Sequence, residues 1–281
     1  MKDLIDLHLH SYYSDGELSP NELIKQAKQK NISIIAITDH DTILGVKNIT
    51  YKDNYVQVIP GIELSAKVDK GRMHILGYGI DIKNKELNDK MNELRDNSLN
   101  SILSLIEQLK KDYNIFFGYD DIKELINSNR NLGRPEIAKL CIKHGYASSV
   151  DDAFDKYLID AYNKIRKNNK GILYEECIKL ILNSGGIPIL AHPKTLNLNH
   201  NELIALIKDM VEKGLKGIEV YHSSHSQEEI NLYLDIAKKF NLLISGGSDF
   251  HGPSVKPDIE MGTGKNNKLN ITNLTLLKEL K

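Results

Sequence analysis

Short apolar strands that end in titratable residues alternate with amphipathic helices along most of this chain. In the first part, the sequence predicts a helix at 20–29 and strands at 4–9, 33–38, 56–65 and 73–79. In the last part, helices at 174–183, 201–213 and 227–239 alternate with strands at 187–191, 217–221 and 242–245. This alternation, with polar residues at strand ends, is typical of a (β/α) barrel or a near relative, whose site lies at one rim. The pattern therefore predicts an α/β fold of this kind.

The middle of the chain has a different sequence pattern. From about 85 to 170, helical periodicities cover 87–109, 119–126, 135–144 and 150–158 without a convincing strand between them. We interpret this stretch as an insertion. The predicted organisation is a barrel domain formed by 1–98 and 166–281, with an inserted helical subdomain at 99–165 that covers the active site.

Composition excludes several classes of function. The 281 residues carry a formal net charge of −1, which gives no global attraction to nucleic acids or membranes. The two cysteines, Cys141 and Cys177, lack CxxC spacing, so no disulfide framework is indicated. The N-terminus does not resemble a signal peptide, and no apolar run reaches membrane-spanning length. We expect a cytoplasmic protein that has no membrane contact and forms no stable nucleic-acid complex.

His8 and His10 are two residues apart on the first predicted strand, so their side chains share one face and can reach one cation. For an isolated pair of this spacing, two ordinary interior or surface histidines are the commoner explanation. Asp15 stands in Ser-Asp-Gly, a composition that is typical of a turn. Taken singly, these residues are weak signals.

Other candidates follow the later strands. Glu63 comes after an apolar run, where a buried carboxylate is costly unless it meets a cation. His74 is interpreted equally well as a core histidine. The remaining strand-end candidates are His40, His192, Asp249 and His251. So many potential ligands at strand ends predict one metal cluster, and the purely nitrogen and oxygen donors favour Mn, Fe or Zn.

Three further residues are candidates for binding substrate. Arg134 begins a predicted helix inside the insertion, where its guanidinium could grip a phosphate, although a solvated helix-entry arginine fits the sequence equally well. His222 and His225 follow the strand at 217–221 and are expected at the same rim as the metal cluster.

The motifs HxH, SDG, TDHD, GIE, AHP and GSDFH, in this order with His74 among them, closely resemble the polymerase and histidinol phosphatase (PHP) superfamily of metal-dependent phosphoesterases. The resemblance spans almost the whole chain. The insertion with Leu-Gly-Arg-Pro at 132–135 and the Gly-Ile-Glu-Val strand at 217–220 resemble the branch of nucleoside 3′,5′-bisphosphate phosphatases and 5′-to-3′ exoribonucleases. Many members have histidine where this chain has Glu136.

The resemblance implies a distorted seven-stranded, TIM-like barrel that holds two or three divalent metals, with Mn favoured for activity. By motif, one ion would be held by His8, His10, Glu63 and Asp249. A second would be held by Glu63, His74 and His192, and a third by Asp15, His40 and His251.

The hypothesis for function is hydrolysis of a nucleotide phosphate ester, or removal of 5′-terminal nucleotides from short RNA. A metal-bridging hydroxide held by Glu63 and Asp249 would attack phosphorus in line, Arg134, His222 and His225 would bind the phosphate, and His225 is a candidate acid. The alternatives are an amidohydrolase on a similar barrel, a histidinol-phosphate phosphatase, and a non-catalytic module of the kind attached to polymerases. The sequence does not predict the oligomeric state.

Overall fold

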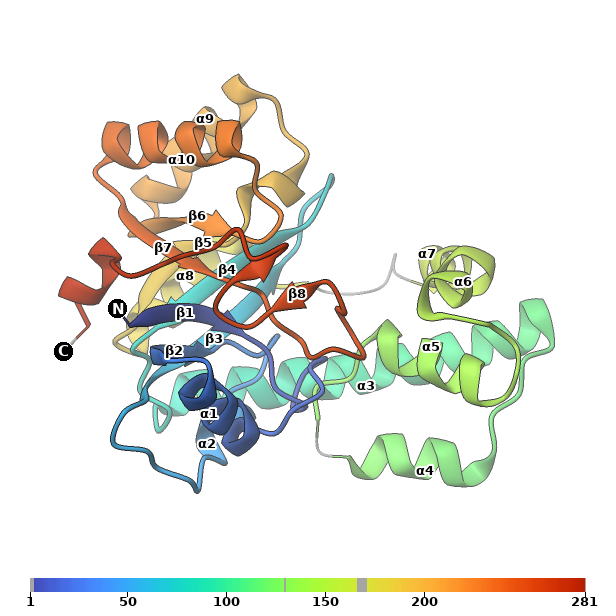
Figure 1. The fold of residues 1–281 in the computed structure, drawn as a ribbon. Helices are drawn as coiled ribbons and strands as arrows, with labels where there is room; N and C mark the ends of the chain where they lie inside the picture. Colours follow the sequence, from blue (N-terminus) through green and yellow to red (C-terminus); the bar gives the residue numbers. More distant parts are fainter. Residues whose placement is uncertain (1–2, 129, 166–170, 281) are drawn as a thin grey trace. The chain divides into compact units, whose positions relative to one another are not determined.

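The computed structural model describes residues 3–128, 130–165 and 171–280, and its centre is a seven-stranded sheet rolled into a barrel (Figure 1). The strands lie side by side in chain order. They are β1 (Leu4–Leu9), β2 (Ile32–Ile37), β3 (Gln57–Ala66), β4 (Met73–Tyr78), β5 (Ile187–Leu190), β6 (Gly217–His222) and β7 (Leu243–Gly247). The predicted distorted α/β barrel is confirmed.

The distortion comes from β4, which pairs antiparallel with both β3 and β5, whereas the other neighbouring strands pair parallel. Only residues 67–72 connect β3 to β4. A parallel partner needs a crossover of a dozen or more residues, so this short connection makes a hairpin. As a result, Glu63 on β3 lies opposite Leu76 on β4, and His74 lies two residues further along, opposite Ser65.

The barrel closes where β1 meets the residues after β7. The backbone N–H of Asp249 donates to the carbonyl of His8 at 2.9 Å, and that of His10 donates to the carbonyl of Phe250 at 3.0 Å. Gly247 lets the two segments approach, because a Cβ at this position would lie 2.4 Å from the backbone nitrogen of His8. Closure therefore brings Asp249 beside His8 on β1 and His10 just after it.

Helices cover the barrel, and their boundaries follow ordinary capping chemistry. Helix α1 (Pro20–Gln29) begins with a capping box between Ser19 and Glu22. The other covering elements are α2 (Leu44–Lys47), α8 (Tyr174–Asn183), the 3₁₀ turn η3 (Pro193–Leu196), α9 (His200–Glu212), α10 (Gln227–Phe240) and the 3₁₀ turn η4 (Thr275–Lys278). A small hairpin of β8 (Ile259–Glu260) and β9 (Gly264–Lys265) follows β7. The core beneath includes Leu7, Ala36, Leu76, Tyr78 and Ile189, all fully buried.

The chain forms two compact units, residues 1–89 with 171–281, and residues 90–170. The second unit has its own core, which includes Leu105, Leu109, Ile137 and Leu158. Its helices are α3 (Lys85–Tyr113, which starts in the first unit), α4 (Tyr119–Asn127), α5 (Arg134–Lys143), α6 (Val150–Ala153), the π-helical turn η1 (Phe154–Leu158) and α7 (Ile159–Ile165). The expected boundary at residue 99 falls inside α3, and the expected end at 165 is the last residue of α7. That this unit covers the active site stays a prediction.

Within the described part of the chain, no helix combines the length and the apolar character that crossing a membrane requires.

Candidate functional site

His8 on β1 and His10, directly after this strand, point to one carboxylate inside the barrel. His8 Nε2 lies 3.0 Å from Glu63 Oε2, and His10 Nε2 lies 3.1 Å from the same oxygen. All three side chains are fully buried. The i, i+2 spacing at the end of β1 therefore places both imidazoles beside the carboxylate of Glu63 on β3.

The second oxygen of Glu63 faces His74 on β4 and His192, two residues after β5. Glu63 Oε1 lies 2.7 Å from His74 Nδ1 and 2.8 Å from His192 Nε2. Burial alone would raise the pKa of Glu63, but the surrounding imidazoles hold that pKa well below its usual range. Glu63 is thus an ionised carboxylate at the centre of the histidine cluster, with one oxygen directed to each side.

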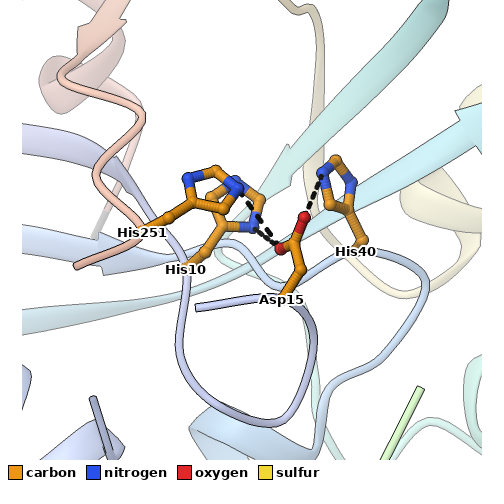
Figure 2. A group of neighbouring side chains, drawn as sticks. All are labelled: His10, Asp15, His40 and His251. Carbon is orange, nitrogen blue, oxygen red and sulfur yellow. Dashed lines mark ion pairs between the residues drawn. The ribbon is translucent and has the colours of Figure 1, made fainter. Parts of the chain in front are cut away.

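A further group surrounds Asp15 (Figure 2). Asp15 Oδ1 lies 3.2 Å from His251 Nε2 and 3.6 Å from His10 Nδ1, while Asp15 Oδ2 lies 3.9 Å from His40 Nε2. The rings of His10 and His251 stack with their centroids 4.0 Å apart. Segments that are distant in sequence, after β1, β2 and β7, therefore supply one compact set of donors.

Asp249 links these groups. Its Oδ1 atom lies 3.3 Å from His10 Nε2 and 3.6 Å from His8 Nε2. The residue has a positive φ of 59°, a backbone conformation that non-glycine residues adopt rarely. His192 is also held at a positive φ, 21°. Strained backbone at two candidate ligands fits a site whose geometry is imposed by the surrounding fold.

The donor atoms fit divalent cations. Four groups of three or four residues have donor atoms that all lie within 4.8 Å of one another: His10, Asp15, His40 and His251; His8, His10 and Glu63; His8, His222 and Asp249; His40, Glu63 and His74. Four buried donor atoms make no hydrogen bond within the described residues: both ring nitrogens of His10, Asp15 Oδ1 and His222 Nε2. Buried polar atoms without hydrogen bonds are rare unless an ion or water meets them. Imidazole and carboxylate donors suit Mn, Fe and Zn.

Glu219 is a functional residue that the sequence analysis missed. From β6, its Oε1 atom lies 2.8 Å from His8 Nδ1, and its Oε2 atom accepts from the backbone N–H of His192 at 2.8 Å. It thereby orients one candidate ligand and holds the strained backbone of another. The signal was available, because a carboxylate between Ile218 and Val220 in a buried strand needs a partner.

Asp6 and Asp39 support the site by accepting hydrogen bonds from loop residues, not by contacting the histidine rings. The carboxylate of Asp6 accepts from Ser248 N at 2.8 Å, Ser248 Oγ at 2.6 Å and Gly262 N at 2.7 Å. Asp39 accepts from the backbone of Ser11 at 2.7 Å and from the hydroxyls of Ser11 and Ser14, both at 2.7 Å. These buried carboxylates fix the loops that carry Asp249 and Asp15.

The three predicted substrate-binding residues lie in different surroundings. His222 Nε2 lies 3.4 Å from Asp249 Oδ2, so His222 joins the cluster. His225 is buried, with its Nδ1 atom 2.9 Å from the carbonyl of Val220 and its ring packed on Tyr233. Arg134 belongs to the second unit, where its guanidinium lies over the ring of Tyr162, 4.6 Å from the centroid.

Glu136, the departure from the family motif, has a structural task. Its carboxylate accepts from the backbone N–H of Gly133 at 2.9 Å, which caps the start of α5, and lies 3.4 Å from Arg130 Nη2. A histidine at this position could not make the same cap with a carboxylate. Glu136 therefore caps a helix in the second unit, at a position where the family motif has the titratable ring of a histidine.

A cavity of about 380 Å³ opens above the cluster. Its floor includes Glu63, His192 and Asp249. Its wall carries Arg72, Lys256 and Lys265, together with the carboxylate of Asp258, which forms an ion pair with Lys265. His222 lines this cavity, whereas His225 is not among its lining residues. Clustered metal-binding donors beneath a cationic cavity, at the strand ends of a barrel, define a metal-dependent hydrolase.

Comparisons with known proteins agree with this class. A model of the PHP domain matches residues 6–250. A 5′-3′ exoribonuclease of Haemophilus influenzae is 30% identical over 250 residues, 88% of this chain and 90% of that protein. A 3′,5′-nucleoside bisphosphate phosphatase of Chromobacterium violaceum is 28% identical over 251 residues, 89% of this chain and 87% of that protein.

A solved structure from Bifidobacterium adolescentis, assigned as a metal-dependent phosphoesterase, matches with a TM-score of 0.78 and 28% identity, and covers 95% of this chain and 93% of that chain. Together with the family match over most of the sequence, this likeness shows that the chain belongs to the PHP domain family. The predicted class of enzyme, a metal-dependent hydrolase of phosphoric esters, is confirmed.

Proposed function

We propose that this enzyme hydrolyses a phosphate ester of a small nucleotide, or removes the 5′-terminal nucleotide of a short RNA. The observation that carries the proposal is the cavity of about 380 Å³, with its metal-binding floor and its cationic wall. Its volume lies in the range of small-molecule sites, which is roughly 300–1,000 Å³. A terminal phosphate with its nucleoside fits such a space, while a long polymer has to extend beyond it.

The names of two relatives support a nucleotide substrate. The Haemophilus influenzae relative is named for exoribonuclease activity and the Chromobacterium violaceum relative for phosphatase activity on nucleoside bisphosphates. The net charge of −1 adds a physical reason to prefer a short substrate, since binding of long RNA usually relies on an extended basic surface.

We assign two or three divalent cations to the cluster, from Mn, Fe and Zn, with Mn favoured for activity. Their ligands would be His8, His10, Glu63 and Asp249 for one ion; Glu63, His74 and His192 for another; and Asp15, His40 and His251 for a third. When bound, such cations lower the pKa of coordinated water and neutralise charge on a phosphoryl group.

The protein's own side chains supply orientation and charge around these positions. Glu219 fixes the ring of His8. Arg72 places positive charge on the cavity wall, which would attract a phosphate dianion, whereas the charge of Lys265 is paired with Asp258. Of the two histidines expected to meet substrate, His222 is the better supported, because it lines the cavity while the ring of His225 packs on Tyr233. Arg134 remains a proposed phosphate contact from the second unit.

The test is phosphate and nucleotide release in the presence of Mn²⁺ from four kinds of substrate: nucleoside 3′,5′-bisphosphates, nucleoside monophosphates, short 5′-phosphorylated RNA and histidinol phosphate. We expect turnover of the bisphosphates or the short RNA and none of histidinol phosphate. Turnover of histidinol phosphate alone would establish the alternative phosphatase. A protein that binds two metals and cleaves no phosphoester would instead favour an amidohydrolase or a non-catalytic module.

A further inference from the structure

Lys256 lies in the loop after β7, and its ammonium group reaches the edge of the histidine cluster. Lys256 Nζ is 2.6 Å from Asp249 Oδ2, and the side chain lines the cavity together with Asp249. The other oxygen of Asp249, Oδ1, faces His10 at 3.3 Å. The lysine therefore contacts one candidate metal ligand, Asp249, directly.

We propose that Lys256 binds the phosphate group of the substrate directly, from a position that its ion pair with Asp249 fixes. The proposal rests on the function proposed above, and it adds the residue that recognises the anionic group undergoing hydrolysis. Neither the motifs of the family resemblance nor the predicted substrate-binding residues include this lysine.

The backbone holds Lys256 in place. The backbone N–H groups of Val255 and Lys256 donate to the carbonyl of Gly252 at 3.1 and 2.9 Å. Glu17 anchors the same loop, since its Oε2 atom accepts from the backbone N–H of Ser254 at 2.9 Å and from its hydroxyl at 2.7 Å. Gly252 has a φ of 101°, which only glycine adopts without strain. The lysine thus extends from a tight turn that several hydrogen bonds hold in place.

The ammonium group retains donors for a ligand. A lysine ammonium has three N–H donors. Among the described residues, Asp249 is the one acceptor that Lys256 Nζ meets at hydrogen-bond distance. A lysine side chain is ordinarily protonated at neutral pH, so its ammonium group attracts an anion. A charged donor on a cavity wall forms strong hydrogen bonds with phosphate oxygens.

A purely structural role for Lys256 makes a different prediction. If the lysine served only to hold the Asp249 carboxylate, its removal would disturb metal binding at Asp249 and would affect phosphate only as a consequence. If the lysine binds phosphate, anion affinity falls while metal content is retained. The two roles are separable by measuring both quantities on the same protein.

The experiment compares wild type with Lys256→Met and Lys256→Arg, each saturated with Mn²⁺. Metal content is measured by elemental analysis, and the dissociation constant of inorganic phosphate is measured by calorimetry. Lys30→Met is the matched control, because Lys30 Nζ also makes a 2.7 Å ion pair, with Glu260, and its side chain is 34% exposed compared with 37% for Lys256. Lys30 is not among the residues that line the cavity.

We expect Lys256→Met to weaken phosphate binding roughly 10- to 100-fold, the loss of one or two charged hydrogen bonds, with unchanged metal content. Lys256→Arg should bind phosphate more tightly than Lys256→Met, and Lys30→Met should match wild type. Unchanged phosphate affinity in Lys256→Met would overturn the proposal, and so would a loss of metal that accounts for the weaker binding. Because the probe is inorganic phosphate, this test does not depend on nucleotide turnover. If no nucleotide reacted, the proposed function would be refuted, but the phosphate affinities of the variants could still be compared.

Discussion

At the scale of single residues, the site depends on Glu219 as much as on the residues that face the cavity. Its two carboxylate oxygens serve two donors, the ring of His8 at 2.8 Å and the backbone N–H of His192 at 2.8 Å. Glutamine has one carbonyl oxygen and cannot accept from both. Because partners of this kind fix the orientation of ligating histidines, Glu219→Gln should lower metal affinity by about 10- to 100-fold.

Competition of Mn²⁺ with a fluorescent chelator measures that affinity. Glu260→Gln provides the control, because Glu260 is a surface glutamate whose side chain is 53% exposed and whose partner is Lys30. Equal affinity in Glu219→Gln and wild type would show that His8 needs no carboxylate to orient it.

The sequence predicted the residues of the cluster better than the residues around it. His8, His40 and His192 stand out because each follows or interrupts an apolar strand, where a titratable group has no ordinary reason to lie. Glu219 occupies the middle of a strand, so it was noticed only as part of a family motif. Lys256 carries no sequence signal, because its role depends on a turn around Gly252 that brings it back to Asp249.

At the scale of elements, the contact between α4 and α5 in the second unit depends on an ionised carboxylate. The stability of this unit should therefore fall at low pH. The carboxylate of Asp121 accepts from the backbone N–H of Gly118 at the start of α4. It also contacts the end of α5, at 2.6 Å from Lys143 Nζ and 2.8 Å from His144 Nε2. The bond from Lys143 is the main reason that the pKa of Asp121 is lowered.

A lowered carboxyl pKa stabilises the folded state above the unfolded pKa, near 3.9, and this contribution is lost as pH falls through the folded pKa. Asp121→Asn should therefore cost about 1 kcal/mol of unfolding free energy at neutral pH, since Lys143 is largely exposed and water screens the pair. The difference from wild type should shrink below about pH 4. Urea unfolding of both proteins across this pH range checks the prediction, and a difference independent of pH would contradict it.

Element boundaries were harder to predict than the elements. Helix α3 runs from Lys85 to Tyr113 and belongs to both units. Its helical periodicity continues across the boundary, so the sequence pattern does not show where one unit ends. The π-helical turn at Phe154–Leu158 was expected as part of one helix, because a single extra residue per turn barely changes the apolar pattern. The antiparallel direction of β4 followed from the short connection before it and not from the residues of the strand itself.

At the scale of the whole molecule, the candidate metal ligands found among the described residues all belong to the first unit, residues 1–89 and 171–281. A ligand that binds only the folded state stabilises it by about 2.7 kcal/mol at one hundred times its dissociation constant. Mn²⁺ should therefore raise the melting temperature in a concentration-dependent manner. The added hydrogen-exchange protection should be confined to strands and loops of the first unit.

Hydrogen exchange with and without Mn²⁺, resolved by peptide, measures this distribution. Exchange in the core of the second unit, around Leu105 and Ile137, should be unchanged. Protection that rises equally in both units would show that metal binding and the second unit are energetically coupled, which the separation into two cores does not predict.

We propose that the carboxylate and imidazole cluster binds the divalent metals that phosphoester hydrolysis requires. The most direct measurement is phosphate release from a nucleoside 3′,5′-bisphosphate by metal-free protein during stepwise addition of Mn²⁺, with Glu63→Gln measured in parallel. Glu63 contacts histidines on both sides of the cluster, so activity should rise with Mn²⁺ in the wild type and stay at background in the variant. Hydrolysis by the metal-free wild type, or full activity in Glu63→Gln, would contradict the claim.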